Sequence, residues 1–314
     1  MNLSDAYKRY KNSYENYPSV MLKRAIKKKV ISVKLKDGTL RNWLDEIVLY
    51  YSKLNYSDSI LNYSGEEKLL KILDDYSSSK LSGSPIELRY NERRIRLFPN
   101  SFGGDFGGFL EIFVENTYKE LLPLEGETVL DIGANIGDSS IYFALNNAEK
   151  VIALEPFPET YLTAKKNIEE NSLTNKITLL NAAYGKDCEV LLDDSVPQNR
   201  LSLLKPSNKG IKVKSYSLET LLNLYNINKA ILKMDCEGCE YQILNENISA
   251  LRKFKRIELE FHYGYRNIEN KLRSAGFSTM VLRVSKSGGK DSDLKSMALN
   301  SNDYTRGLLY AELI

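Results

Sequence analysis

The sequence predicts an α/β fold, with a mostly parallel β-sheet and helices on both faces of the sheet. Three apolar runs lead to this prediction, since residues 128–132, 150–154 and 230–234 have the composition of buried parallel strands. Polar residues or glycines follow each run, and a helical pattern comes after them. Because ligands of such sheets bind at the carboxyl ends of the strands, these polar residues mark the expected site.

Length and composition set the remaining limits. The chain has 314 residues, of which 42% are hydrophobic and 27% are charged, so a packed core is expected. The net charge of +3 is spread along the chain and gives no case for a nucleic-acid partner. Three cysteines without an export signal favour a reducing, cytoplasmic setting. No apolar run reaches the roughly 20 residues of a membrane span, although the basic N-terminal segment leaves a peripheral membrane contact open.

The first hundred residues read as a separate α+β extension of unknown role. Asp37-Gly38 and Asn91-Glu92 predict two hairpins, and residues 41–54 and 66–73 are apolar at helical spacing. Residues 101–314 form the second predicted domain. It begins with a Gly/Phe-rich loop at residues 101–108, which is either a gating loop or a linker.

A glycine loop follows the first strand of the core. Gly133, Asn135 and Gly137 allow the backbone to turn and to approach a ligand closely. Asp131, at the end of the strand, would repel a pyrophosphate but would pair with the cationic amino group of a methionine-derived ligand. The loop therefore favours S-adenosylmethionine over NAD, and a dehydrogenase would also need a third glycine where Ser140 stands.

Two further positions fit the same ligand. Glu155 lies 24 residues after Asp131 at the end of the next strand, where a carboxylate can bind both ribose hydroxyls. Asn181 and Ala182 follow a third strand, where an adenine ring would be recognised. Residues 189–217 read as a hairpin insertion after it.

A second dense motif brings three carboxylates together. Asp235, Glu237 and Glu240 lie within six residues after an apolar strand, and burying them together is costly unless they contact cations, donors or a metal. The plainer interpretation is that they cap the following helix. Another strand, at residues 257–261, precedes His262, the only histidine in the chain.

With both motifs in place, the sequence resembles the FkbM family of S-adenosylmethionine-dependent methyltransferases over about residues 105–285. The resemblance rests on residues 129–138, Glu155-Pro156, residues 181–183, residues 232–240 and Glu260-x-His262, in that order. It implies a Rossmann-like class I methyltransferase fold with seven strands, the last of them antiparallel, and O-methyl transfer to a hydroxyl of a sugar, glycan or small-molecule natural product. The residues that it implies for cofactor binding are Asp131, Gly133, Ala134, Asn135, Gly137, Glu155, Pro156, Asn181, Ala182 and Asp235.

The implied catalytic residues are Asp235, Glu237 and His262. A sulfonium carries its own leaving group, so the protein has to align an in-line displacement and accept a proton from a weakly acidic hydroxyl. His262 or Asp235 would be the base and Glu237 would orient it, and the pKa argument alone does not choose between the two bases.

Cations and thiols offer other interpretations of the same residues. A divalent cation could bind Asp235, Glu237 and Glu260, since hard oxygen ligands suit magnesium. Cys236-x-x-Cys239 could bind zinc together with Cys188 and His262, or could serve redox chemistry. Apolar filling of variable positions is favoured over both interpretations of the cysteines.

Two other functions compete with catalysis on a small acceptor. One is a methyltransferase-like module that binds S-adenosylmethionine without turnover, and the other is an RNA methyltransferase. The intact acidic set with His262 argues against the first, and the scattered charges argue against the second. We therefore expect a small-molecule or glycan acceptor and no nucleic acid, and leave the oligomeric state open.

Overall fold

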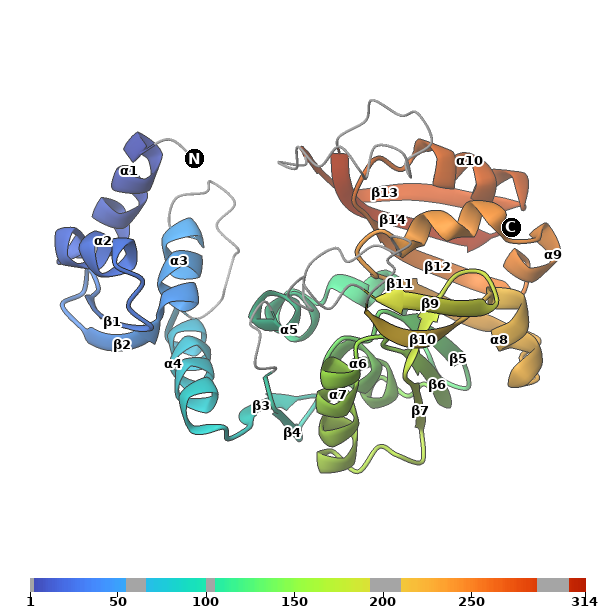
Figure 1. Ribbon diagram of the computed structural model, residues 1–314, viewed down its shortest axis with the longest axis horizontal. Coiled ribbons are helices and arrows are strands. Elements are labelled where there is room, and N and C mark those ends of the chain that lie inside the picture. The colour runs from blue at the N-terminus through green and yellow to red at the C-terminus, as the bar shows by residue number, and fades with distance from the viewer. Residues whose placement is uncertain (1–2, 55–65, 100–104, 193–209, 287–304) are drawn as a thin grey trace. The chain divides into compact units, whose positions relative to one another are not determined.

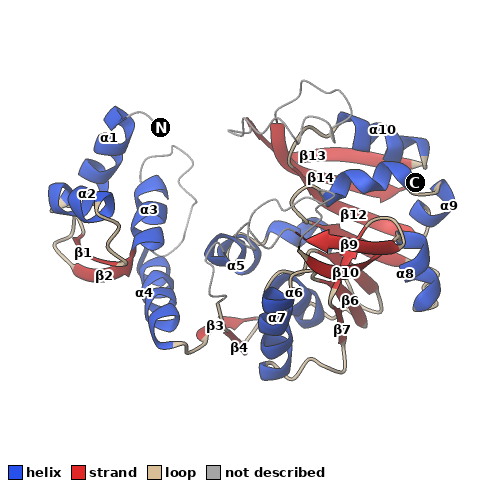
Figure 2. Cartoon of the chain, viewed as in Figure 1, coloured by secondary structure: helices blue, strands red, loops and turns tan. Residues whose placement is uncertain are grey.

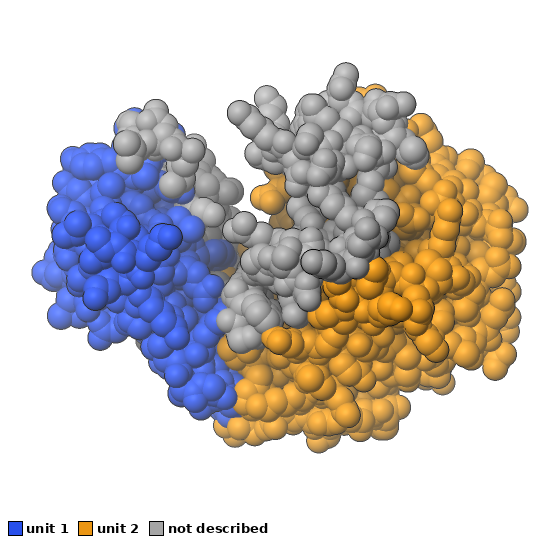
Figure 3. All heavy atoms as spheres, in the orientation of Figure 1, with its two compact units in different colours: residues 1–89 blue, residues 90–314 orange. Residues whose placement is uncertain are grey.

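The computed structural model describes residues 3–54, 66–99, 105–192, 210–286 and 305–314 (Figures 1 and 2). The chain divides into two compact units, Met1–Arg89 and Tyr90–Ile314 (Figure 3). The sequence-based division stood at residue 100, so the unit that carries the sheet begins earlier than expected. Among the described residues, none of the helices is long and apolar enough to cross a membrane.

The first unit is an α+β body with its own core. Its elements are α1 (Leu3–Ser13), α2 (Tyr17–Ala25), β1 (Val30–Lys34), β2 (Leu40–Leu44), α3 (Asp45–Leu54), α4 (Glu66–Ser82) and β3 (Ile86–Tyr90), which ends at the boundary. β1 and β2 pair antiparallel around Gly38, whose φ is +86°, so the first predicted hairpin is confirmed. Trp43 is fully buried, and its indole nitrogen donates to Asp74 at 2.6 Å.

The second unit is built on a seven-stranded sheet in the order β13-β14-β12-β11-β5-β6-β7. Only β14 runs antiparallel to its neighbours, so the predicted fold class, with one antiparallel strand near the C-terminus, is confirmed. The strands are β5 (Thr128–Ile132), β6 (Lys150–Leu154), β7 (Ile177–Leu180), β11 (Ala230–Met234), β12 (Phe254–Phe261), β13 (Phe277–Lys286) and β14 (Thr305–Leu313).

Helices cover both faces of this sheet (Figures 1 and 2). The core on one face joins Leu130, Leu232 and Ile257 to buried residues of α8 (Leu218–Leu224), η2 (Cys239–Asn245), α9 (Ile248–Leu251) and α10 (Arg266–Ser274). The other face meets η1 (Thr117–Leu121), α6 (Asp138–Leu145) and α7 (Pro158–Glu170), with α5 (Asp105–Phe113) against α6. Residues alternate between the two faces along each strand, so Asp131 and Lys233 point to the second face.

The third predicted strand and the end of the Gly/Phe-rich loop differ from the sequence-based expectation, whereas two predicted hairpins are present. The third predicted strand is divided into β7 and β8 (Ala182–Tyr184), and β8 joins β10 (Ile211–Tyr216) and β9 (Cys188–Leu192) in a separate small sheet. β9 and β10 pair antiparallel, which confirms the hairpin insertion. Residues 101–104 of the predicted Gly/Phe-rich loop lie outside the described residues, and α5 already begins at Asp105. The second predicted hairpin is present as β3 and β4 (Arg93–Leu97).

Candidate cofactor and acceptor site

The glycine loop lies against the end of β11. Gly133 and Gly137 have φ of +79° and +85°, and Asn135 also has a positive φ of +47°. A Cβ atom at Gly133 would lie 1.9 Å from the carbonyl oxygen of Asp235, so no other residue fits there without a backbone shift. The backbone nitrogens of Gly133 and Ala134 donate to the carbonyl of Leu154 at 3.0 and 2.9 Å, which ties the loop to the end of β6.

Glu155 lies under this loop. Its carboxylate accepts hydrogen bonds from the backbone nitrogens of Asn135 at 3.0 Å and Phe157 at 2.9 Å. Burial raises the pKa of Glu155 to about 8. The side chain of Asn181 donates to the carbonyls of Glu155 and Pro156 at 3.0 and 2.9 Å. The residues expected to bind ribose and adenine are therefore in contact with one another, with the buried Ala182 directly after Asn181.

Asp131 is fully buried and already has a cationic partner. Its carboxylate accepts hydrogen bonds from the hydroxyls of Ser139 and Ser140 at 2.7 and 2.6 Å, and Oδ1 lies 2.9 Å from Nζ of Lys233. The cation next to Asp131 in the structure is thus a lysine of the chain itself. A contact between Asp131 and the amino group of a ligand stays a prediction.

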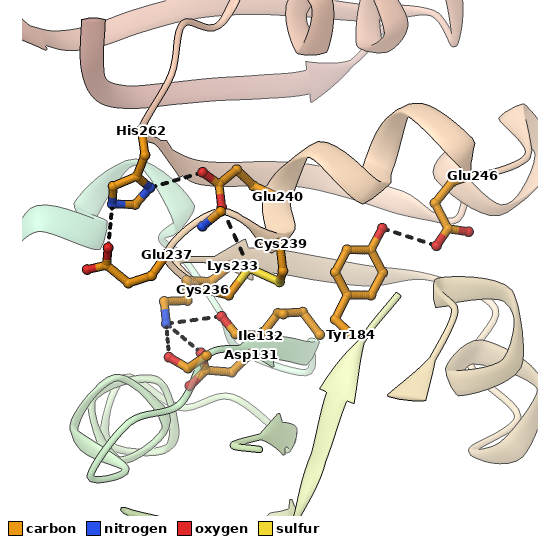
Figure 4. The surroundings of a disulfide bond; sticks show 12 residues. Asp131, Ile132, Tyr184, Lys233, Cys236, Glu237, Cys239, Glu240, Glu246 and His262 are labelled. Atoms are coloured by element: carbon orange, nitrogen blue, oxygen red, sulfur yellow. Dashed lines mark hydrogen bonds and ion pairs between the residues drawn. A yellow bond between two sulfur atoms is a disulfide. The ribbon is translucent and has the colours of Figure 1, made fainter. Parts of the chain in front are cut away.

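Lys233 is a functional candidate that the sequence reasoning missed. Its ammonium group also donates to the carbonyl of Gly133 at 2.8 Å, so one buried side chain joins β11, β5 and the glycine loop (Figure 4). Burial works to lower the pKa of Lys233, but Asp131 and Asp235 outweigh it and raise the pKa, so the ammonium group stays charged. The signal in the sequence was a lysine within the apolar run of residues 230–234.

The acidic motif after β11 forms a tight loop with a disulfide bond inside it. Glu237 and Gly238 have φ of +56° and +119°, and Cys236 is bonded to Cys239 across them (Figure 4). Both cysteines are partly buried against the core, as the apolar-filling interpretation expects, but that interpretation did not include the bond between them. The zinc set is wrong, because two of its four ligands are bonded to each other and Cys188 is a free, exposed cysteine on β9.

His262 lies between two glutamates of this motif (Figure 4). Its Nδ1 is 2.9 Å from Oε1 of Glu240, and its Nε2 is 3.2 Å from Oε2 of Glu237. Glu240 is fully buried, and its other oxygen accepts a hydrogen bond from the backbone nitrogen of Gly238 at 2.7 Å. Glu240 thus combines the predicted capping role, at the start of η2, with orientation of the histidine, and Glu237 occupies the more exposed side.

The carboxylates and the imidazole shift the pKa values of one another. Partial desolvation of its carboxylate by the surrounding loop, together with Asp235 and Glu240, raises the pKa of Glu237 to about 7, although His262 opposes the shift. Burial works to lower the pKa of His262, but Glu240 and Glu237 outweigh it and raise the pKa to about 10. The imidazole is therefore protonated on both nitrogens and positively charged near pH 7. Glu237 is the member of the pair that titrates near neutrality.

Three of these residues could hold a cation. Asp235, Glu237 and His262 each offer a ligand atom, and these atoms lie within 4.8 Å of one another. His262 takes the place that the sequence assigned to Glu260, whose Oε1 lies 3.8 Å from Nε2 of the histidine. Burial and Asp235 raise the pKa of Glu260 to about 8.

Comparison with known proteins finds a family match within the second unit. Residues 131–279 match the model of the methyltransferase FkbM domain, which confirms the resemblance found in the sequence. Over 94 residues the chain is 33% identical to the 23S rRNA (uracil(1939)-C(5))-methyltransferase RlmD of Shewanella frigidimarina, a match that covers 30% of this chain and 20% of that protein. The chain thus spans about a fifth of the length of this relative. We expected no nucleic acid among the partners of this chain. The match to an rRNA methyltransferase contradicts that expectation, which was wrong.

Solved structures with a similar chain path have low sequence identity. The M1A22 tRNA methyltransferase TrmK of B. subtilis matches with a TM-score of 0.36 and 17% identity, over 63% of this chain and 64% of that one. A precorrin-6y C5,15-methyltransferase from Geobacter metallireducens matches with a TM-score of 0.36 and 15% identity, over 63% and 87% of the two chains.

Proposed function

We propose that this chain transfers the methyl group of S-adenosylmethionine to a hydroxyl oxygen. The premise is that residues 131–279 form a methyltransferase FkbM domain of the S-adenosylmethionine-dependent type. The observation that carries the proposal is the position of His262 between Glu237 and Glu240, beside Asp235 at the carboxyl edge of the sheet. This arrangement offers a proton-accepting group next to the end of β5, where the cofactor is expected.

The cofactor would lie along the carboxyl ends of β5, β6 and β7. Glu155 would accept hydrogen bonds from both ribose hydroxyls, and its contacts with the backbone of Asn135 and Phe157 support this role because they fix the carboxylate under the loop. Asn181 and Ala182 would flank the adenine. Asp131, together with the backbone of the glycine loop, would bind the methionine end of the cofactor.

The acceptor would bind between Asp235 and Glu237. Bound S-adenosylmethionine would supply a methyl group on a sulfonium leaving group, so the residues of this site would have to hold the acceptor oxygen for attack on that methyl carbon. The hydroxyl proton passes to the Glu237–His262 pair, which acts as one proton-accepting unit. Glu240 holds His262 as the carboxylate of a catalytic triad holds its histidine, and is a positioning residue.

In the first form of this proposal, the acceptor is a sugar, a glycan or a small natural product. Methylation of RNA is a second candidate, and the 33% identity to an rRNA methyltransferase over 94 residues favours it. A divalent cation at Asp235, Glu237 and His262 is the alternative to proton transfer within the pair, since a bound cation would itself make a hydroxyl more acidic.

Two measurements test the proposal. Calorimetry should detect binding of S-adenosylmethionine and S-adenosylhomocysteine to the purified chain. Cofactor labelled in its methyl group, incubated with the chain and a cell extract, should then label a product in the small-molecule, glycan or RNA fraction, with nuclease and glycosidase digestion identifying the fraction. Binding without label in any fraction would favour the non-catalytic module, and absence of binding would refute both functions.

A further inference from the structure

The disulfide between Cys236 and Cys239 encloses the most exposed residue of the proposed acceptor site. Only Glu237 and Gly238 lie between the two cysteines, and both cysteines are half-buried at the sheet edge (Figure 4). A bond between positions this close along the chain removes little conformational freedom from the unfolded state, so it contributes little to the stability of the fold as a whole. Its effect is local, on the two residues that it encloses.

The enclosed residues have a conformation that the bond helps to maintain. Glu237 has a φ of +56°, in the left-handed region that residues with a Cβ atom rarely adopt. In this conformation its Oε2 is 3.2 Å from Nε2 of His262. Without the bond between the cysteines, Glu237 would be free to adopt the right-handed region, and its carboxylate would then leave the histidine.

The bond also lies beside the second glutamate that holds the histidine. Sγ of Cys236 is 3.8 Å from Oε2 of Glu240. This oxygen also accepts a hydrogen bond from the backbone nitrogen of Gly238 at 2.7 Å. The other oxygen of Glu240 is 2.9 Å from Nδ1 of His262. The two carboxylates nearest to the histidine are therefore in, or next to, the ring that the disulfide closes.

We propose that the Cys236–Cys239 disulfide is a redox-active site that exchanges with a dithiol reductant, and that its reduction releases Glu237 from His262. The proposal rests on the proposed function for its effect on turnover. In the exchange, a thiolate of the reductant attacks one sulfur of the pair and forms a mixed disulfide, and the second thiolate of the reductant then displaces the chain. Two electrons and two protons pass to the chain, which gains two thiols, and the reductant becomes a disulfide.

The reduced chain would keep its cofactor site. The contacts of Glu155 with the glycine loop and of Lys233 with Asp131 do not involve the bonded loop. Affinity for S-adenosylmethionine should therefore change by less than about threefold on reduction. kcat/KM for the acceptor should fall about tenfold or more, because a positioned base contributes about 10²–10⁴ to the rate.

The test follows the redox state and the histidine separately. The chain is equilibrated with mixtures of reduced and oxidised dithiothreitol, alkylated, and weighed by mass spectrometry to count free thiols. Because His262 is the only histidine, a histidine-selective NMR spectrum contains one imidazole that reports on the site. Reduction should shift this signal at the same dithiothreitol ratio at which the two thiols appear.

Two variants serve as controls. Cys188→Ser removes the free, exposed cysteine on β9 and should leave the response unchanged. The double variant C236S/C239S should give the histidine signal of the reduced chain under all conditions and should not respond to dithiothreitol.

Two results would overturn the proposal. One is an imidazole signal that is identical in the oxidised and reduced chains after alkylation has verified both states. The other is two free thiols at Cys236 and Cys239 even in excess oxidised dithiothreitol. Neither readout depends on methyl transfer, so an inactive chain with an intact redox response would refute the proposed function alone.

Discussion

Nζ of Lys233 lies 2.9 Å from Oδ1 of Asp131, and both side chains are almost completely buried, with 2% and 0% of their surface exposed. The two residues are in register on the neighbouring strands β11 and β5. Since the same ammonium group binds the carbonyl of Gly133, the ion pair connects the acidic strand end to the glycine loop.

Replacing one partner of this pair should destabilise the fold. Lys233→Met leaves the carboxylate of Asp131 buried without a cation, so the free energy of unfolding should fall by about 3–5 kcal/mol, measured by denaturant titration. The control Lys255→Met removes a more exposed ion pair with Glu127 and should cost about 0–1 kcal/mol. The double variant D131N/K233M should be more stable than K233M alone, and equal stability would contradict a coupled pair.

The close approach at Gly133 can be separated from its backbone conformation. Gly133→Ala and Gly126→Ala place a Cβ on glycines with similar φ, +79° and +72°, but only the first Cβ meets another atom, the carbonyl oxygen of Asp235 at 1.9 Å. Both variants should lose about 1–2 kcal/mol from the left-handed conformation, and G133A should lose more stability because its Cβ meets the backbone of Asp235. G133A should in addition lose affinity for S-adenosylmethionine by calorimetry, and equal affinities in the two variants would mean that the contact has no role in binding.

Glu237→Gln should reduce methyl transfer without reducing cofactor binding. The amide cannot accept the hydroxyl proton, so kcat/KM should fall about 10²–10⁴-fold while the Kd for S-adenosylmethionine changes little. Glu189→Gln, at an exposed position on β9, is the matched control and should be fully active. Full activity of E237Q would remove Glu237 from the proposed proton transfer.

The pH dependence should reflect the two pKa values of the pair. kcat/KM should rise with pH as Glu237 loses its proton near its pKa of about 7. Histidine-selective NMR should give a pKa of about 10 for His262, and Glu240→Gln should lower that pKa. Because this pKa lies above the ordinary value of 6.5, the stabilisation from the charged histidine is complete below about pH 6.5 and is lost as the pH rises through about 10. A pKa near 6.5 in the unmodified chain would contradict the arrangement.

Removal of divalent cations separates the two proposed ways of activating the hydroxyl. If the Glu237–His262 pair accepts the proton, methyl transfer should continue in excess EDTA at an unchanged rate. A loss of activity that added Mg²⁺ or Mn²⁺ restores would instead favour a cation at Asp235, Glu237 and His262.

The sequence predicted the sheet and its functional edge because these depend on local patterns. Each of Gly133, Glu155 and Asp235 comes after an apolar run, and this local pattern is enough to indicate the carboxyl end of a parallel strand. The pairing of Asp131 with Lys233 depends instead on the register between β5 and β11, which are distant in sequence, and no local pattern determines it. The disulfide had no unique signal either, since the C-x-x-C spacing is equally compatible with zinc binding, redox chemistry or packing.

The contacts of His262 show the same limit. His262 follows β12 and Asp235 follows β11, and these two strands are paired in the sheet. Which of the nearby carboxylates holds each ring nitrogen depends on the left-handed turn at Glu237 and Gly238, a feature of the folded loop. Orientation by Glu240 was therefore not foreseen.

The register of the central strands has a consequence for the charge balance of the interior. Lys233 lies opposite Asp131 on one side and Glu258 on the other, so three ionisable side chains form a row across the middle of the sheet. Burial raises the pKa of Glu258 to about 8, so near neutral pH this acid is mostly uncharged and lies beside the ion pair of Lys233 and Asp131. A variant with aliphatic residues throughout this row would need Asp131 and Lys233 to be replaced together, whereas Glu258 could be replaced first and alone.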